Sequence, residues 1–165
     1  MFKNRRLLFL YLKCSIVCAL LSSVPMIFYV RDAKFTETWL LYVGDGVFLF
    51  TLFLALMILS KKAGDNASTG YMLMAGHTIT VMAIIVICII TFIVLLIYIP
   101  GLLQIGTTNK ILKQAPVNTV EDKTRGLLFI LFVNAVIGTF SAGSFTSVVT
   151  AYTIKREQRG DKADL

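Results

Sequence analysis

The sequence predicts an all-α membrane protein, a bundle of four transmembrane helices with both termini cytoplasmic. Its 165 residues are 57% hydrophobic and only 15% charged, whereas a soluble domain is about 45–50% apolar and about 25% charged. The apolar residues are gathered into runs of roughly 20, the length that a helix needs to cross about 30 Å of hydrocarbon. This composition excludes disordered, collagen-like and disulfide-stapled proteins.

The spanning helices are expected at about residues 7–30, 39–59, 71–100 and 126–154, in one integral membrane domain of residues 1–165. The first run contains Lys13, which we expect to extend its amine to the headgroups. The third run is uncharged from Ile79 to Ile99. Its continuous apolar residues do not alternate with polar ones, as the strands of a membrane barrel do. Helices are therefore the predicted spanning elements.

Short polar segments separate the runs. Residues 31–34 and 60–66 contain charged residues, and Pro100 followed by glycine ends the third run, because proline lacks the N–H that a helix needs. An outer loop is expected over 101–125.

The distribution of Lys and Arg predicts the orientation, since these residues are enriched on the cytoplasmic side. The side that holds both termini and the 60–66 connection has the larger number of them. The formal charge of +7 is explained in this way, and we expect no nucleic-acid partner. A plasma or inner membrane fits this charge pattern best.

The first run has one alternative interpretation, a cleaved signal peptide, because Lys3, Arg5 and Arg6 precede it. Lys13 divides the run, and no cleavage site of small residues is well placed. We therefore expect a retained first helix.

Polar residues within the runs form a candidate intramembrane site. Counted from the outer ends of their helices, Ser23, Asp45, Thr91 and Asn134 all lie roughly 9–12 Å deep. Ionisable groups inside a span are costly and are functional candidates by default. One interpretation is a hydrated pocket or ion vestibule around Asp45. The others are a structural hydrogen bond between Asp45 and Asn134, or an Asp45 that lies nearer the headgroups.

The only histidine, His77, is expected at the cytoplasmic interface, far from Asp45. Metal and catalytic signatures are weak. One histidine and no Cys-x-x-Cys motif give no zinc spacing, and residues 138–143 miss the nucleophile-elbow spacing by one position. We predict no metal and no cofactor.

The fourth run contains two adjacent ridges of small residues at four-residue spacing, which allow close helix packing. The ridges comprise Ala135, Gly138, Thr139, Ala142, Gly143, Thr146, Ser147, Thr150 and Ala151. One interpretation of this face is packing within the chain. The other is docking onto a second copy or a larger membrane protein.

The sequence does not specify one activity. The leading hypothesis is a non-enzymatic accessory or interaction subunit that packs through the fourth helix, with the lipid bilayer and a membrane protein as partners. The first alternative is a small transporter or channel subunit that uses the polar site around Asp45. The second alternative is an intramembrane enzyme, for which no catalytic residues are indicated.

Overall fold

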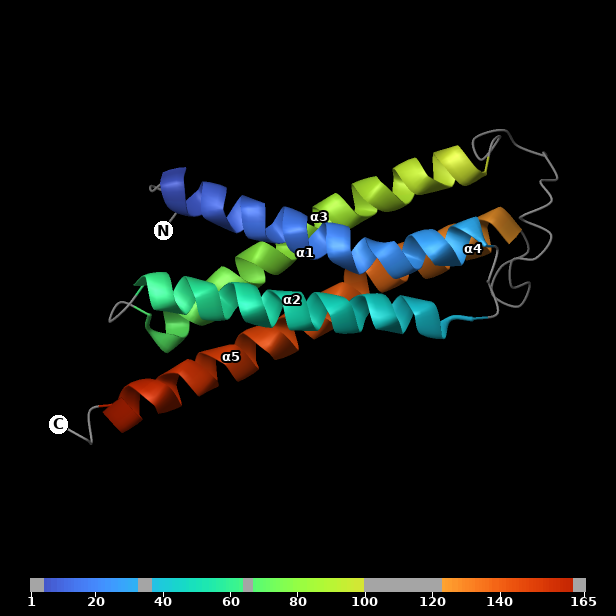
Figure 1. Cartoon of the computed structure of the whole chain (residues 1–165). Coiled ribbons are helices and arrows are strands. Elements are labelled where there is room, and N and C mark those ends of the chain that lie inside the picture. The colour runs from blue at the N-terminus through green and yellow to red at the C-terminus, as the bar shows by residue number, and fades with distance from the viewer. Residues whose placement is uncertain (1–4, 33–36, 64–66, 100–122, 162–165) are drawn as a thin grey trace.

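The computed structural model describes residues 5–32, 37–63, 67–99 and 123–161, and every regular element in these ranges is helical (Figure 1). The elements are α1 (Arg5–Arg31), α2 (Trp39–Ala63), α3 (Thr69–Tyr98), α4 (Lys123–Val133), the π-helical turn η4 (Asn134–Gly138) and α5 (Thr139–Asp161). The last three are consecutive, and together they are called the fourth helix. The all-α prediction is confirmed, as are four helices long and apolar enough to cross a membrane.

Several helices extend beyond the apolar runs that predicted them. α2 continues to Ala63, and the fourth helix begins at Lys123, inside the segment expected to be outer loop. The rest of that loop lies outside the described residues. α3 begins at Thr69, where the Ser68 hydroxyl oxygen accepts a hydrogen bond from the Tyr71 N–H at 3.2 Å. An apolar run shows only the part of a helix that can lie in hydrocarbon. The helix itself is longer, because polar turns and capping residues extend it at the ends.

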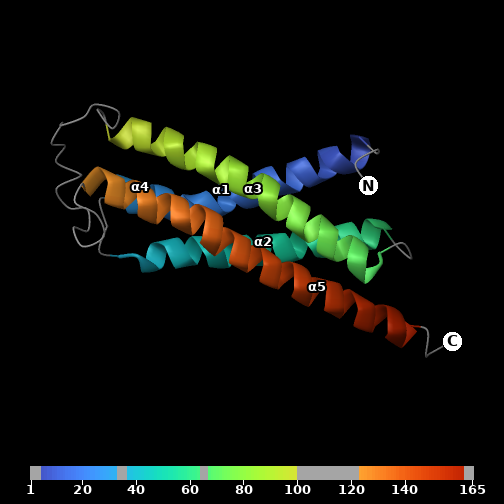
Figure 2. The same ribbon diagram turned by 180° about the vertical axis from the view of Figure 1, so that it is seen from behind.

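The four helices form a ring in which each has two principal neighbours. α1 packs against α2 and α3, and the fourth helix packs against the same two. α1 and the fourth helix therefore occupy opposite corners. In both views the helices converge near the middle of the molecule and diverge toward its ends (Figures 1 and 2). The two ends are called here the Trp39 end and the Lys62 end.

Large apolar side chains cover the outside of the bundle. Phe50, Ile97 and Phe145 are 62%, 66% and 61% exposed. Exposed apolar surface over every helix is unusual for a water-soluble monomer, and it is the surface that contact with lipid requires.

The small residues of the fourth helix lie largely inside the bundle. A Cβ atom at Gly143 would overlap the side chain of Thr80 on α3, and one at Gly76 of α3 would overlap Ser147. The two backbones therefore approach closely at two successive points. Ala135, Thr139, Gly143, Thr146, Ser147, Thr150 and Ala151 are buried, and Gly138 and Ala142 are partly buried.

Candidate functional site

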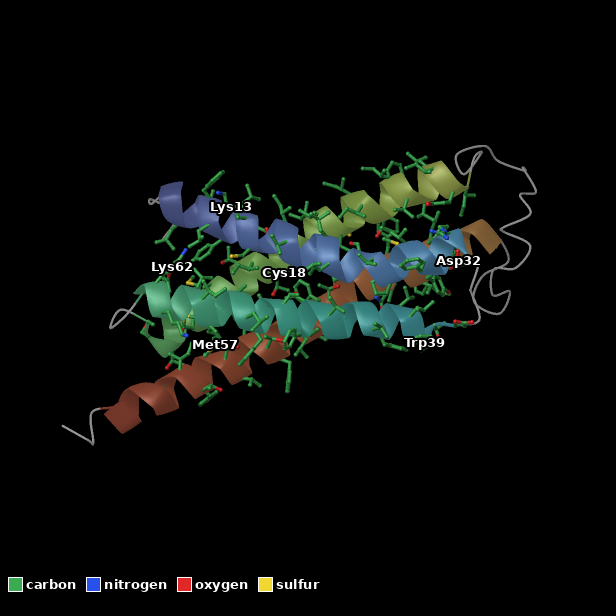
Figure 3. The ribbon with its side chains drawn as sticks, viewed as in Figure 1. Lys13, Cys18, Asp32, Trp39, Met57 and Lys62 are labelled. Carbon is green, nitrogen blue, oxygen red and sulfur yellow. The ribbon has the colours of Figure 1, made fainter. Side chains whose placement is uncertain are left out.

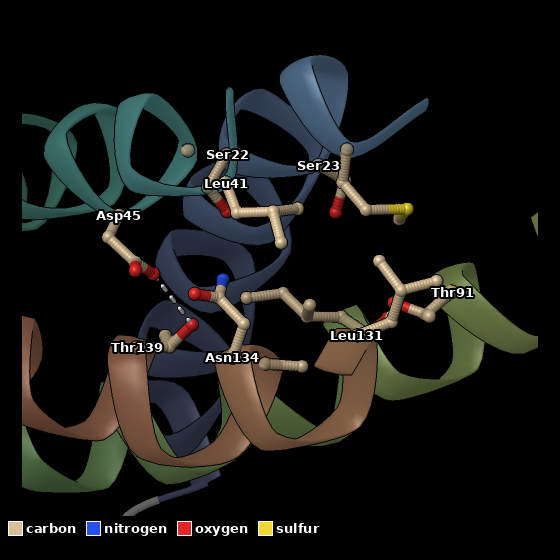
Figure 4. A pocket seen from close by; sticks show the side chains of 12 residues that line it. Ser22, Ser23, Leu41, Asp45, Thr91, Leu131, Asn134 and Thr139 are labelled. Atoms are coloured by element: carbon tan, nitrogen blue, oxygen red, sulfur yellow. Dashed lines mark hydrogen bonds between the residues drawn. The ribbon is translucent and has the colours of Figure 1, made fainter. Parts of the chain in front are cut away.

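Asp45 is half-buried on α2 and points across the bundle to the fourth helix (Figure 4). The Thr139 hydroxyl donates a hydrogen bond to Asp45 Oδ1 at 3.5 Å. The side chain of Asn134 lines the same cavity, and its Oδ1 lies beside the carboxylate at Gly138. Both polar groups come from one helix, and the bond to Thr139 is long enough to be weak.

The π-helical turn explains how Asn134 and Thr139 reach the same carboxylate. The two residues are five positions apart, which in an α-helix would place them about 140° apart around the axis. In η4 the Thr139 N–H donates to the Asn134 carbonyl oxygen, which is the five-residue pattern of a π-helix. Thr139 therefore lies over Asn134, and both side chains point toward α2.

Because Gly138 has no side chain, the Asp45 carboxylate can occupy the space beside its Cα. A Cβ atom at this position would lie 2.6 Å from Asp45 Oδ2 and 3.1 Å from Asn134 Oδ1. Both oxygens therefore border the bare Cα of Gly138. Any larger residue there would have to displace the carboxylate.

Gly44 brings α1 close to the same region. A Cβ atom at Gly44 would lie 2.9 Å from the carbonyl oxygen of Ser22, so the α1 and α2 backbones nearly touch. This approach carries Ser22 and Ser23 toward the site. Gly46, on the other side of Asp45, has nothing within 4 Å of its Cβ position.

These contacts enclose a small cavity to which all four helices contribute (Figure 4). Its volume is about 20 Å³, and a cavity needs about 10–15 Å³ on this measure to hold one water. The site has room for a water or a small ion, and an organic substrate does not fit. The lining residues are Ser22, Ser23, Met26, Leu41, Gly44, Asp45, Ile87, Thr91, Leu131, Asn134, Ala135 and Thr139.

The hydroxyl groups in this cavity are arranged chiefly as acceptors. Ser23 donates to the Ala19 carbonyl at 2.7 Å, and Thr91 donates to the Ile87 carbonyl at 2.8 Å. Each hydroxyl has one proton, and in both cases the residue's own helix takes it. The oxygen lone pairs remain available to the cavity. Together with the Asp45 carboxylate they make an oxygen-rich, negatively polarised site.

The cavity lies where two apolar clusters meet. Met26, Leu41 and Leu131 belong to the cluster at the Trp39 end. Ile87 and Ala135 belong to the cluster that extends to the Lys62 end. The polar groups therefore form a layer that divides the apolar core.

The structure places all four predicted polar residues, Ser23, Asp45, Thr91 and Asn134, around this one cavity. Thr139 and Gly138 were assigned to the packing face, yet they are the residues nearest the carboxylate. Ser22 was not singled out. The five-residue spacing between Asn134 and Thr139 would place both side chains at the site only if a π-helical turn lay between them. The sequence does not indicate such a turn.

His77 is partly buried on α3, about two turns from the start of that helix at Thr69. Its ring stands edge-on to that of Phe140, with centroids 6.3 Å apart. Its Nδ1 is 2.9 Å from the Leu73 carbonyl oxygen. His77 is not among the residues that line the Asp45 cavity.

Within the described ranges, no group of three or more His, Cys, Asp or Glu side chains is placed to hold a metal ion. The chain matches no protein-family model, and searches of curated proteins and of solved structures find no relative. A proposal for the function must therefore be based on the chemistry of the Asp45 cavity.

Proposed function

We propose that the protein is a small multi-pass membrane protein, a transporter or channel subunit that binds a small monovalent cation at Asp45. The observation that carries this proposal is a carboxylate beside a water-sized cavity lined by oxygen acceptors. Asp45 supplies the negative charge, and Asn134 and Thr139 orient its carboxylate.

The size and chemistry of the cavity favour a small cation over other ligands. Sodium-like cations prefer carboxylate, carbonyl and hydroxyl oxygens, and an anion would meet the Asp45 carboxylate directly. An acid inside a span is costly unless it has a partner or a function. A bound cation would offset that cost.

The membrane context of the proposal comes from the outer surface and the helix lengths. The four spanning helices expose large apolar side chains, and the sequence charge pattern supports cytoplasmic termini. In that orientation the Trp39 end faces outward and the cation site lies in the outer leaflet.

The test is ion flux in proteoliposomes that contain the purified protein, with sodium, potassium and proton gradients applied separately. Asp45→Asn should reduce the flux about tenfold or more, because a hydrogen bond to a charged group contributes about 1.5–3 kcal/mol. Gly138→Ala should also reduce it, since the added methyl group would meet Asp45 Oδ2.

Asp32→Asn is the matched control, because Asp32 is exposed and pairs with Arg31 at 3.2 Å outside the cavity. It should leave the flux unchanged. Thermal unfolding in detergent checks that each variant folds. The absence of flux with the unmodified protein, or equal flux with folded Asp45→Asn, would refute the proposal.

Docking of a partner through the fourth helix is the second candidate, and it has less support. The small residues that suggested it contact α2 and α3 of the same chain. A partner would have to use the outward side, where Phe140, Phe145 and Tyr152 are exposed. A co-purifying protein that is lost with Phe145→Ala would favour this candidate.

A further inference from the structure

A second and larger cavity opens between α1, α2 and α3 at the Lys62 end. Its volume is about 330 Å³, within the range of about 300–1,000 Å³ that is usual for small-molecule sites. It lies at the far end of α2 from Asp45, so its contents are independent of the cation site. The lining residues are Leu7, Leu10, Leu59, Lys62, Ala63 and Tyr71.

The cavity exists because α1 diverges from α2 toward its own N-terminal end (Figures 1 and 2). A hydrogen bond from the Tyr11 hydroxyl to the Tyr71 hydroxyl, at 3.2 Å, ties α1 to the start of α3. This bond holds α1 against α3 while the α2 side stays open. The cavity therefore follows from the arrangement of the helices.

One charged group lines the cavity. Lys62 is exposed at the end of α2, and it lies between this end and the N-terminal end of α1 (Figure 3). It belongs to the lining of the cavity, so its ammonium is available to a ligand there. Within the described part of the chain, no carboxylate forms an ion pair with Lys62.

The lining of the cavity is mostly apolar, with two polar groups. Lys62 and the Tyr71 hydroxyl lie among apolar side chains from α1 and α2. A cationic group and a tyrosine at the end of a spanning helix, above an apolar slot, match the two parts of an anionic lipid. Lipid also surrounds any protein in a bilayer, so lipid molecules can enter an opening on the side of the bundle.

We propose that this cavity binds an anionic phospholipid, whose phosphate contacts the Lys62 ammonium while one acyl chain lies along Leu7, Leu10 and Leu59. The attraction between Lys62 and the phosphate gives selectivity for anionic over zwitterionic lipid. The apolar wall adds affinity in proportion to the chain area it covers.

The test is native mass spectrometry of the purified full chain in mild detergent, with phosphatidylglycerol or phosphatidylcholine added. The unmodified protein should retain phosphatidylglycerol preferentially. Lys62→Gln should weaken that retention about tenfold, the usual minimum effect of losing a hydrogen bond to a charged group. Lys62→Arg should retain the lipid, since it keeps the charge.

Lys61→Gln is the matched control, because Lys61 is exposed and adjacent but does not line the cavity. A second pair tests the apolar wall. Leu10→Trp should exclude the lipid by filling the cavity, and Leu8→Trp, on a residue that is 37% exposed and outside the lining, should not.

Three results would overturn the proposal. Equal losses in the Lys61 and Lys62 variants would show a diffuse basic surface. Equal retention of phosphatidylcholine would show an unselective apolar slot, and displacement of phosphatidylglycerol by inorganic phosphate alone would show a free-anion site.

Discussion

Gly44 and Gly46 are both adjacent to Asp45 in the sequence, but they face different surroundings in the structure. Gly44 faces the α1 backbone at Ser22, and Gly46 faces open space. The sequence does not distinguish these two positions. The structure assigns the close helix approach to Gly44, which is buried, while Gly46 is exposed.

Gly44→Ala should therefore destabilise the bundle by about 1–3 kcal/mol, the usual cost of overpacking. Its Cβ would meet a backbone carbonyl that cannot rotate away. Gly46→Ala should be neutral or slightly stabilising, because alanine has the higher helix propensity. Thermal unfolding of the two variants in the same detergent provides the comparison, and equal midpoints would contradict the assigned close approach.

Counting residues from the helix ends was sufficient to group Ser23, Asp45, Thr91 and Asn134 at one depth. Depth is predictable because the rise per residue of a helix is fixed. Rotation about the axis is less predictable, since a single non-α turn changes it. For that reason Thr139 and Gly138 were assigned to packing, although they lie beside the Asp45 carboxylate.

At the scale of the element, η4 behaves as one residue inserted into an otherwise α-helical fourth helix. Buried residues occur on both sides of it, at Leu131 in α4 and at Gly143 in α5. The inserted residue leaves the packing faces before and after the turn aligned. π-helical turns of this kind occur frequently at functional sites, and this one adjoins the carboxylate.

Deleting Ile137, which is 61% exposed within η4, should convert the turn to α-helix and preserve the fold. Asn134 and Thr139 would then be four positions apart, which places them on the same face of an α-helix. We expect a change in unfolding free energy of about 1 kcal/mol or less, in line with a surface change.

Deleting Val148 is the contrasting variant, because it lies on an exposed side of α5 where the helix has no extra residue. That deletion rotates every later residue by about 100° and turns Thr150, Ala151 and Ile154 out of the bundle. It should lower the unfolding midpoint far more than deletion of Ile137. Equal effects would show that η4 is not an insertion in this sense.

The small-residue ridges of the fourth helix show what an element's sequence can and cannot predict. Spacing by four identified the face that packs closely, and the contacts of Gly143 with Thr80 occur on that face. The spacing did not identify the partner. The partner residues Gly76 and Thr80 lie on α3, whose residues are mostly large and apolar, so its sequence does not mark the face that packs.

At the scale of the molecule, the all-α class and four helices long and apolar enough to cross a membrane followed from the composition and from the lengths of the apolar runs. Hydrocarbon requires internally bonded helices of a set length. The order of helices around the ring did not follow. Every helix is apolar on most of its circumference, so hydropathy does not choose neighbours. Close contacts between small residues, such as Gly44 with Ser22, select them.

Insertion of all four helices would place both termini on one side of the membrane. The charge pattern predicts that this side is the cytoplasm. Fusing a fluorescent protein that folds only in the cytoplasm to either terminus should give signal in both cases. A phosphatase that is active only outside, fused to the same positions, should be inactive. The reverse pattern would place the Asp45 cavity in the inner leaflet.

The helices converge near the middle of the molecule and diverge toward its ends, which gives the bundle a waist (Figures 1 and 2). α3 has 30 residues and is about 45 Å long, which is more than the roughly 30 Å of hydrocarbon in a typical bilayer. In a membrane this helix would either lean or extend its ends among the headgroups. A narrow waist and broad ends would displace more area among the headgroups than among the chain ends. Lipid curvature and thickness would then act on the helix crossing angle before any ligand binds.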